Sequence, residues 1–256
     1  MTKPIGLGDP KPRFYWNCED GVKQTAYRIL CTREGKTVWD SGKVDSSSMT
    51  HIPYEGAELN SRDIVTWCIQ LWDEKDEPGE ISESCFELGL LKCTDWKARW
   101  ISGDYRPDPK RRYPVDCFRK EFSAKPVVKA RLYAAARGVY DVTVNGRRIE
   151  DFILAPGSTD YKKRIQVQTY DVTDYLKEQN TLELRLADGW YRGSLAAYGV
   201  TNVFGTRTSV LCQLELTFTD DQKETIVTDN SWAWSDDGPL RFADLLLLPA
   251  SIIFSS

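Results

Sequence analysis

The residue types that most often carry enzyme chemistry are scarce in this sequence of 256 residues. It contains a single histidine, His51, which lies in the turn-rich segment 46–56. Because there is no second histidine and no CxxC pair, we expect no histidine/cysteine zinc site. We also expect no Ser-His-Asp triad, for which His51 is the one histidine in the sequence. We expect His51 to be a surface loop residue. Gly6 and Gly8 lack the strand and helix that a phosphate-binding loop requires.

Acidic residues are plentiful, but the sequence does not mark any of them as a catalytic pair. There are 38 Asp and Glu residues and a net charge of −4. Glycoside hydrolysis usually needs two carboxylates that face each other across a cleft. No spacing singles out two such residues, so we assign no catalytic residues. The charge also offers no basic face for a nucleic acid.

The seven cysteines are odd in number, and most lie in apolar runs typical of strands. They predict reduced core thiols in a reducing compartment rather than a disulfide framework or a metal site. Residues 1–12 are polar and do not show the pattern of a secretory signal peptide. These features together predict a cytoplasmic protein, with no cofactor assigned.

Short alternating runs separated by Gly, Asp, Asn and Pro dominate the chain, and helical periodicity is nearly absent. This pattern predicts an all-β protein. The first domain, residues 1–94, holds about six or seven short strands, the number found in immunoglobulin-like and fibronectin type III sandwiches. The clearest candidates are residues 24–32, 37–42, 64–72 and 82–90.

A polar, proline-containing junction over residues 95–116 separates this domain from a second β series, residues 117–244. Asn145-Gly146 is typical of a two-residue type I′ hairpin turn. Thr173 is expected to be the N-cap of a one-turn helix over 174–177, with Asp171 stabilising the turn. Strands are expected at residues 129–135, 138–144, 147–149, 167–170, 181–186, 209–219 and 224–228. Together with the two turns, these strands predict a galactose-binding-like jelly-roll sandwich.

Two sets of segments resemble a known family. In the first domain, residues 24–29, 38–44 and 88–101 are similar to the fibronectin-type module that opens many α-L-rhamnosidases. The second domain resembles the jelly-roll domain that follows this module in glycoside hydrolase family 78. The similar segments are residues 138–146, 154–161, 168–173 and 188–193. Each piece alone fits many sandwiches, but their combination in this order, over residues 12–244, is specific.

The resemblance implies a bacterial enzyme that removes terminal α-L-rhamnose with inversion. It also implies two acidic catalytic residues in an (α/α)6 barrel, which lies further along the family's chain than this sequence extends. We therefore expect this chain by itself not to be an enzyme. The implied partners are that catalytic barrel and a rhamnose-containing glycan or glycoside, and neither a nucleic acid nor a membrane is expected.

The last residues depart from the family pattern. The similarity holds through Asp244, after which a polar stretch is expected, but residues 245–256 are mostly apolar. Such a run is too short to cross a bilayer. Two explanations remain open: a terminal core strand, or the product of a frame shift or truncation after Asp244.

Some relatives of the second domain bind rhamnose with the help of a calcium ion. Sugar rings stack on aromatic side chains, and their hydroxyl groups need carboxylate and amide partners at loop ends. No calcium-loop motif is present, so a calcium site is not located. Trp190 has a second interpretation, in which it caps the sandwich or packs against the barrel. The predicted carbohydrate-binding residues are Asp160, Tyr161, Trp190, Tyr191 and Arg192.

Three hypotheses of function follow. In the first, the chain is the accessory, non-catalytic part of an α-L-rhamnosidase and contributes carbohydrate recognition and bracing of the catalytic domain. In the second, it is a stand-alone rhamnose-type lectin. In the third, both domains are a purely structural brace that binds no ligand.

Overall fold

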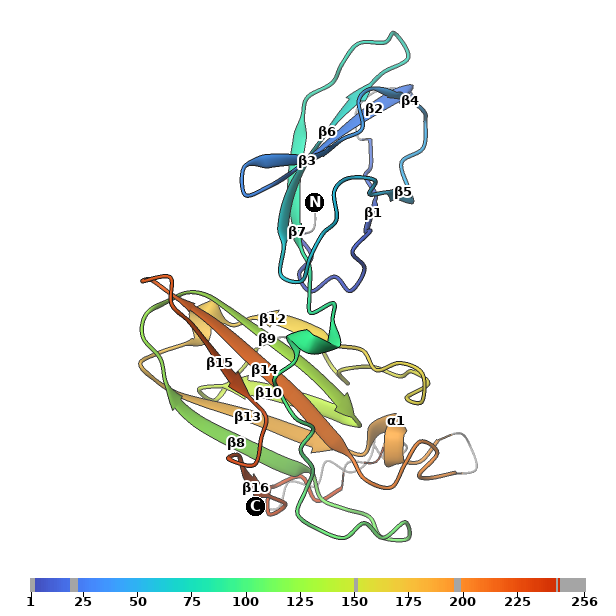
Figure 1. Cartoon of the computed structure of the whole chain (residues 1–256). Helices are drawn as coiled ribbons and strands as arrows, with labels where there is room; N and C mark the ends of the chain where they lie inside the picture. Colours follow the sequence, from blue (N-terminus) through green and yellow to red (C-terminus); the bar gives the residue numbers. More distant parts are fainter. Residues whose placement is uncertain (1–2, 19–22, 150–151, 196–198, 243, 245–256) are drawn as a thin grey trace. The chain divides into compact units, whose positions relative to one another are not determined.

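The computed structural model describes residues 3–18, 23–149, 152–195, 199–242 and 244. The apolar segment 245–256, for which we left two explanations open, lies outside the described residues. The chain divides into two compact units, Met1–Trp96 and Lys97–Ser256 (Figure 1). Among the described residues no helix has the length and apolar content needed to span a membrane. The cytoplasmic location stays a prediction.

The first unit is an antiparallel β-sandwich. Its main sheet has the order β3-β2-β6-β7, with β4 paired to the end of β2, and β1 and β5 form a separate two-stranded sheet. The elements are β1 (Arg13–Phe14), β2 (Ala26–Arg33), β3 (Lys36–Asp40), β4 (Val44–Asp45), β5 (Ile52–Pro53), β6 (Ile64–Trp72), β7 (Ser82–Glu87) and the 3-10 helix η1 (Cys93–Asp95).

The alternation of buried and exposed side chains along the strands determines the core of this unit. In β6, Val65 and Trp67 are buried while their neighbours face outward, as expected when one face of a sheet is covered. Phe14 of β1 lies against Trp67, with ring centroids 4.9 Å apart, so the small sheet closes the sandwich. His51 is exposed, as predicted, and its Nδ1 lies 2.9 Å from the hydroxyl of Tyr15.

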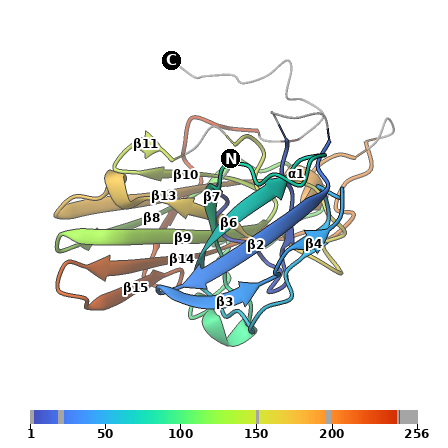
Figure 2. The same cartoon turned by 90° about the horizontal axis from the view of Figure 1, so that it is seen from above.

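The second unit is a larger antiparallel sandwich of two sheets, with orders β11-β10-β13-β8-β16 and β12-β9-β14-β15. Figure 2 shows β10, β13 and β8 of the first sheet side by side, and likewise β9, β14 and β15 of the second. Its elements are β8 (Asp116–Ser123), β9 (Val127–Arg137), β10 (Val139–Val144), β11 (Arg147–Arg148), β12 (Gln168–Asp171), η2 (Thr173–Tyr175), β13 (Gln179–Ala187), α1 (Gly189–Arg192), β14 (Ser209–Phe218), β15 (Lys223–Val227) and β16 (Ala233–Ser235).

The core of the second unit lies between these two sheets. Leu182, Leu184 and Leu186 of β13 face small and large residues of β9 and β14, such as Ala134 and Leu214, and all five are almost completely buried. Intervening residues of β13 point away from the core, which is the period-2 pattern of a half-buried strand. The prediction of an all-β fold with two sandwiches is confirmed.

Several local predictions can be compared with the structure. Asn145 and Gly146 both have positive φ values, 53° and 74°, as a type I′ turn requires. Asp171 accepts hydrogen bonds from the backbone nitrogen (3.1 Å) and hydroxyl (2.6 Å) of Thr173, so it does stabilise that turn. The predicted cap was wrong: Val172 is the N-cap of η2, because Thr173 already lies in the helix.

The cysteines lie partly where we expected them. All seven fall within the described residues, and none forms a disulfide. Cys31 and Cys212 are core residues, and burial raises the pKa of Cys31 to about 12. The prediction that most are core residues was wrong, because two are exposed and three are only half-buried. In β6, for example, Cys68 occupies the face that points away from the core.

The segment predicted as a junction, residues 95–116, contacts the second unit over part of its length. The backbone nitrogen of Arg99 donates to the carbonyl of Thr228 (2.8 Å), and Ile101 forms a β-bridge with Val210. The side chain of buried Gln213 accepts from the backbone nitrogen of Lys97 at 2.7 Å. Around Ile101 the segment therefore adds to the edge of the sheet beside β14 before it enters β8.

Candidate functional site at the α1 end of the second unit

The single turn α1 follows β13 directly and lies close against β10. Gly189 has a φ of +49°, and a Cβ at this position would overlap the side chain and backbone of Val139. Only glycine combines this backbone conformation with such close approach. The turn thereby fixes the positions of Trp190, Tyr191 and Arg192.

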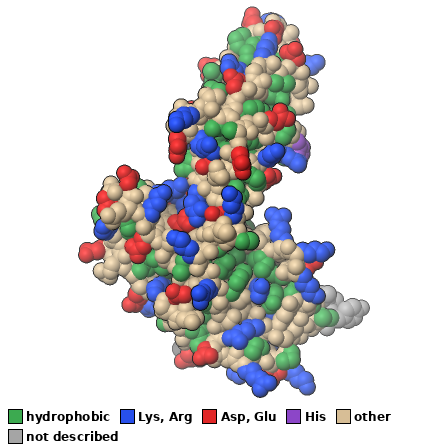
Figure 3. All heavy atoms as spheres, in the orientation of Figure 1, with side chains coloured by type: hydrophobic (Ala, Val, Ile, Leu, Met, Phe, Trp, Pro, Cys, Tyr) green, Lys and Arg blue, Asp and Glu red, His purple; other side chains and the backbone are tan. Residues whose placement is uncertain are grey.

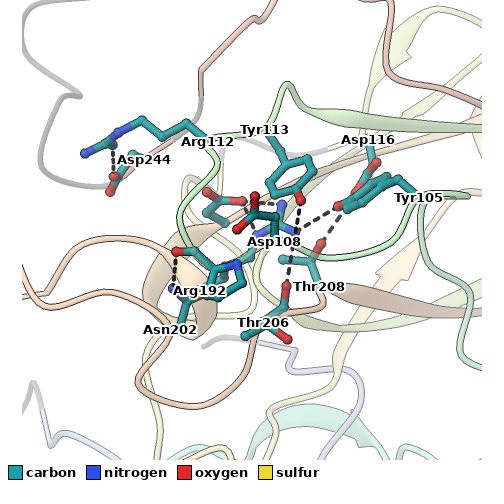
Figure 4. Close-up of polar contacts among 12 residues, drawn as sticks. Tyr105, Asp108, Arg112, Tyr113, Asp116, Arg192, Asn202, Thr206, Thr208 and Asp244 are labelled. Atoms are coloured by element: carbon teal, nitrogen blue, oxygen red, sulfur yellow. Dashed lines mark hydrogen bonds and ion pairs between the residues drawn. The ribbon is translucent and has the colours of Figure 1, made fainter.

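Arg192 is the centre of a buried polar cluster. Its guanidinium forms a salt bridge with Asp188 at 2.6 Å. It also donates a hydrogen bond to the hydroxyl of Tyr105 at 2.8 Å (Figure 4). Its charged plane also lies over the ring of Tyr113, 4.5 Å from the centroid. Since Arg192 is only 5% exposed, the protein supplies nearly all of its contacts.

Asp116, the first residue of β8, extends this cluster. Its carboxylate accepts hydrogen bonds from the hydroxyl of Tyr105 (3.1 Å), the indole nitrogen of Trp234 (2.9 Å) and the hydroxyl of Thr208 (3.4 Å). A continuous path of hydrogen bonds and ion pairs therefore runs from Asp188 through Arg192 and Tyr105 to Asp116. It joins α1 to the first strand of the unit.

Asp244 is the third buried acid at this end. It accepts hydrogen bonds from the backbone nitrogen (2.7 Å) and the hydroxyl (2.6 Å) of Ser194, and it pairs with Arg112. Burial alone would raise the pKa of Asp244, but the bonds from Ser194 and the charge of Arg112 hold it below its ordinary value. The chain is thus fixed to the second unit at residue 244.

We call Asp116, Asp188, Arg192 and Asp244 the Asp–Arg network. Burial raises the pKa of both Asp116 and Asp188, against the opposing effect of the Arg192 charge. Buried Arg192 therefore offsets the charges of Asp188 and Asp116, while Arg112 pairs with Asp244. Neutral donors such as Tyr105 and Trp234 bond to the carboxylate of Asp116.

This donor set does not fit a calcium ion. Calcium takes six to eight oxygen ligands, largely from carboxylates and carbonyls. In the network the carboxylates are already occupied by hydrogen-bond donors, and the Arg192 guanidinium supplies the cation. Across the described ranges, no three His, Cys, Asp or Glu side chains come together as a metal ion would require.

The five residues predicted to contact sugar have different surroundings. Tyr161 is buried, its hydroxyl donates to the carbonyl of Gly157 (3.2 Å), and burial raises its pKa to about 12. Its ring lies edge-on to that of Tyr191 at 5.3 Å, which joins the loop before β12 to α1. Tyr191 and Trp190 are half-buried on α1.

The other two predicted residues differ in exposure. Asp160 is exposed, and its carboxylate accepts from the backbone nitrogen of Lys162 (3.1 Å), which stabilises its own turn. Arg192 lies in the Asp–Arg network instead of at the surface. The structure thus brings Tyr161 and Tyr191 into contact. For Asp160 and Arg192 it shows contacts with other residues of the chain.

Sequence reasoning missed Tyr105, Tyr113, Asp116 and Asp244. The first two lie in the segment that we expected to be a junction, and Asp116 begins a strand that we did not predict. The one available local signal was the four-residue spacing of Asp188 and Arg192, which allows an ion pair across one helical turn. The remaining contacts join residues far apart in the chain.

Comparison with known proteins decides the family. A model of the "Rha78A-like, N-terminal immunoglobulin domain" matches residues 1–92, and one of the "Alpha-L-rhamnosidase N-terminal domain" matches residues 125–247. The chain belongs to the α-L-rhamnosidase family, as an N-terminal part of it. This confirms the resemblance that the sequence motifs indicated.

Curated relatives give the same picture. An α-L-rhamnosidase of Formosa agariphila is 37% identical over 266 residues, which cover 96% of this chain and 28% of the relative. An α-L-rhamnosidase of Alteromonas sp. is 36% identical over 95% of this chain and 28% of the relative. The chain therefore spans less than a third of the length of these two α-L-rhamnosidases.

Solved structures of the family share this fold. The α-L-rhamnosidase of Aspergillus terreus superposes with a TM-score of 0.86 at 31% identity, over 94% of this chain and 29% of that one. That of Dictyoglumus thermophilum gives 0.81 at 32% identity, with the same coverage. The two sandwiches are thus those of the N-terminal region of α-L-rhamnosidases.

Proposed function

We propose that this chain is the non-catalytic N-terminal part of an enzyme that hydrolyses terminal α-L-rhamnose, and that the α1 end of its second unit braces the rest of that enzyme. Family membership supports the parent activity. The absence of a recognisable pair of facing carboxylates in the sequence supports the assignment of catalysis to a different part of the enzyme.

The observation that carries the bracing role is the attachment of residue 244. Asp244 is only 6% exposed and is held by Ser194 and Arg112, which belong to two different segments of the second unit. Any chain that continues from this point starts from a fixed position beside α1. A following domain would therefore begin next to the Asp–Arg network.

Apolar side chains are exposed close to this attachment. Val203 and Phe242 are 42% and 51% exposed. Val203 lies between Asn202, whose backbone nitrogen donates to the carbonyl of Arg192, and Phe204, whose nitrogen donates to that of Tyr191. Phe242 lies two residues before Asp244. Contiguous exposed apolar patches mark surfaces that another domain covers, and in this proposal Val203 and Phe242 belong to such a surface.

Basic side chains outnumber acidic ones in the loops at this end, over residues 106–112 and 162–164, although the net charge of the chain is −4. Figure 3 shows side chains of both signs on the face that it draws. An interface of this kind depends on apolar burial more than on long-range electrostatic attraction. Substitutions that place a charge among the apolar groups are therefore the most informative.

The test joins residues 1–244 to the remaining part of the Formosa agariphila relative. We expect Val203→Asp and Phe242→Asp to lower the melting temperature of this chimaera by several degrees, and to leave that of the unfused chain unchanged. Val128→Asp is the matched control, because Val128 is 57% exposed at the other end of the sandwich. Equal melting temperatures for all chimaeras would reject the brace.

Carbohydrate recognition at the α1 end is a second candidate function. It is favoured by the half-exposed position of Trp190 beside Tyr191, on a turn whose backbone is fixed by Gly189 and the buried side chain of Arg192. In this proposal Trp190, Tyr191 and Asp160 contact a rhamnose-containing glycan, while buried Tyr161 and Arg192 hold their loops in place. Calorimetric titration with L-rhamnose tests it, since Trp190→Ala should abolish any binding.

A further inference from the structure

An open groove lies at the end of the second sandwich that holds the β8–β9 loop and the β14–β15 hairpin. Figure 1 shows these two connections at the end opposite to α1. The groove is bounded by the β8–β9 loop, by residues 176–178 before β13, and by the β14–β15 hairpin. Its volume is about 840 Å³. Pockets that hold drug-sized ligands span roughly 300–1,000 Å³, so this groove is large enough for a ligand of more than one ring.

The floor of the groove is apolar. Ala124 and Phe218 are buried members of the core, and Val127 and Leu176 are half-buried and pack against it. Such a floor favours a ligand that offers C–H groups, since burying apolar area against it is stabilising. These four side chains offer a ligand no hydrogen bonds.

The rim of the groove carries charged side chains that are available to a ligand. Lys177, Glu178, Lys223 and Glu224 line it, and in the described part of the chain none of these side chains forms an ion pair or hydrogen bond. Lys125 differs, because it pairs with Asp220 (3.3 Å) and its ammonium group also contacts Gln222.

The charges of the four rim side chains that form no ion pair or hydrogen bond balance one another. Two ammonium groups, those of Lys177 and Lys223, can donate, and two carboxylates, those of Glu178 and Glu224, can accept. Their charges sum to zero, so the rim offers hydrogen bonds of both kinds without attracting a strongly charged ligand. A hydroxyl group suits such a rim because it both donates and accepts.

The backbone around the groove is held in place without a ligand. Ala124 donates from its backbone nitrogen to the carbonyl of Glu178 (2.9 Å), Thr219 to that of Pro126 (3.1 Å), and Phe218 to that of Gln222 (2.9 Å). All three boundaries of the groove are therefore hydrogen-bonded to each other or internally. Preorganisation of this kind reduces the entropy lost on binding.

We propose that this groove binds a neutral oligosaccharide. A sugar chain is the ligand class that combines C–H faces for the apolar floor with hydroxyl groups for the mixed rim. The choice of a rhamnose-containing probe rests on the proposed role in a rhamnosidase. The groove is separate from the α1 end, so binding here is compatible with bracing there.

The test titrates the whole chain with a neutral L-rhamnosyl-D-glucose disaccharide and with the L-rhamnosyl-D-glucuronic acid disaccharide of the same linkage, by calorimetry and by amide chemical shifts. We expect the neutral probe to bind, with shifts in the β14–β15 hairpin. The double variant Lys177→Ala/Lys223→Ala should weaken binding about tenfold or more, as loss of charged hydrogen-bond donors does. Lys163→Ala, on an 84% exposed lysine near α1, is the matched control and should bind like the wild type.

Each other outcome overturns the inference. Absence of binding by the neutral probe rejects the groove as a glycan site. If the acidic probe binds more tightly than the neutral one, the proposal that the groove selects a neutral ligand is rejected. Binding that survives the double lysine variant but is lost in Trp190→Ala places the sugar at the α1 end instead. None of these results bears on the brace, because that role is measured separately by the melting temperature of the chimaera.

Discussion

The roles of single residues at the α1 end follow from burial more than from residue type. Arg192 has the chemistry of a ligand-binding side chain, yet it is buried against Asp188 and Tyr105 and acts as a positioning residue. From the sequence, its type and its spacing from Asp188 could be recognised. Its contact with Tyr105 could not, because 87 residues separate the two.

The first prediction concerns this ion pair. Arg192→Leu leaves the carboxylate of Asp188 buried without its cation, so we expect it to lower the free energy of unfolding by about 3–5 kcal/mol. Arg241→Leu is the matched control, since Arg241 pairs with Asp237 at the same four-residue spacing but in exposed positions. Its loss should cost no more than about 1 kcal/mol. Urea unfolding of both variants checks this, and equal losses would contradict it.

The second prediction concerns pH. Burial raises the pKa of Asp116 above its ordinary value of 3.8, so the folded state binds this proton more tightly than the unfolded state does. Between the ordinary and the raised value, stability therefore falls as pH rises, and the cost is complete above the raised value. Asp188 acts in the same direction, and Asp244 in the opposite one.

Replacing the ionisable group isolates its contribution. Asp116→Asn keeps an acceptor for Trp234 but cannot ionise, so we expect a smaller fall in stability with rising pH than in the wild type. The measurement is the free energy of unfolding by urea at a series of pH values from 3.8 upward. Asp237→Asn, at an exposed site, serves as the control. An unchanged slope in Asp116→Asn would show that this group does not titrate as described.

At the scale of elements, the alternation of apolar and polar residues predicted most strands, but it missed β8, which lies inside its sheet. β13 shows clear period-2 burial, whereas residues 132–136 of β9 are buried without interruption, and both strands were predicted. β8 was not, because its sequence DCFRKEFS places charged residues along an outward face and only Phe118 deep in the core. Its position comes from backbone pairing with β13 and β16, which local sequence does not reveal.

The third prediction tests this alternation in β13. Leu184→Ala removes a completely buried side chain from between the two sheets, so we expect a loss of about 2–5 kcal/mol in the free energy of unfolding. Arg185→Ala, the next residue along the strand, is exposed and should change it by no more than about 0.5 kcal/mol. Chemical denaturation of the two variants measures the difference. Similar losses for both would mean that the register of β13 is wrong.

At the scale of the whole molecule, the sequence motifs predicted both sandwiches and the family, because turn residues and strand patterns recur in a fixed order. The predicted domain limits, 1–94 and 117–244, stay a prediction about where the folded domains separate. The Asp–Arg network could not be foreseen, since it assembles three segments that are distant in the sequence, at residues 116, 188–192 and 244. Asp244, a member of this network, is what links the fold to the proposed brace.

The fourth prediction tests the central claim, that catalysis belongs to a part of the enzyme other than residues 1–256. The measurement is the release of p-nitrophenol from p-nitrophenyl α-L-rhamnoside at high protein concentration. The unfused chain should give no turnover above buffer. The chimaera with the remaining part of the Formosa agariphila relative should be active. Turnover by the unfused chain that survives repurification and scales with its concentration would contradict the account.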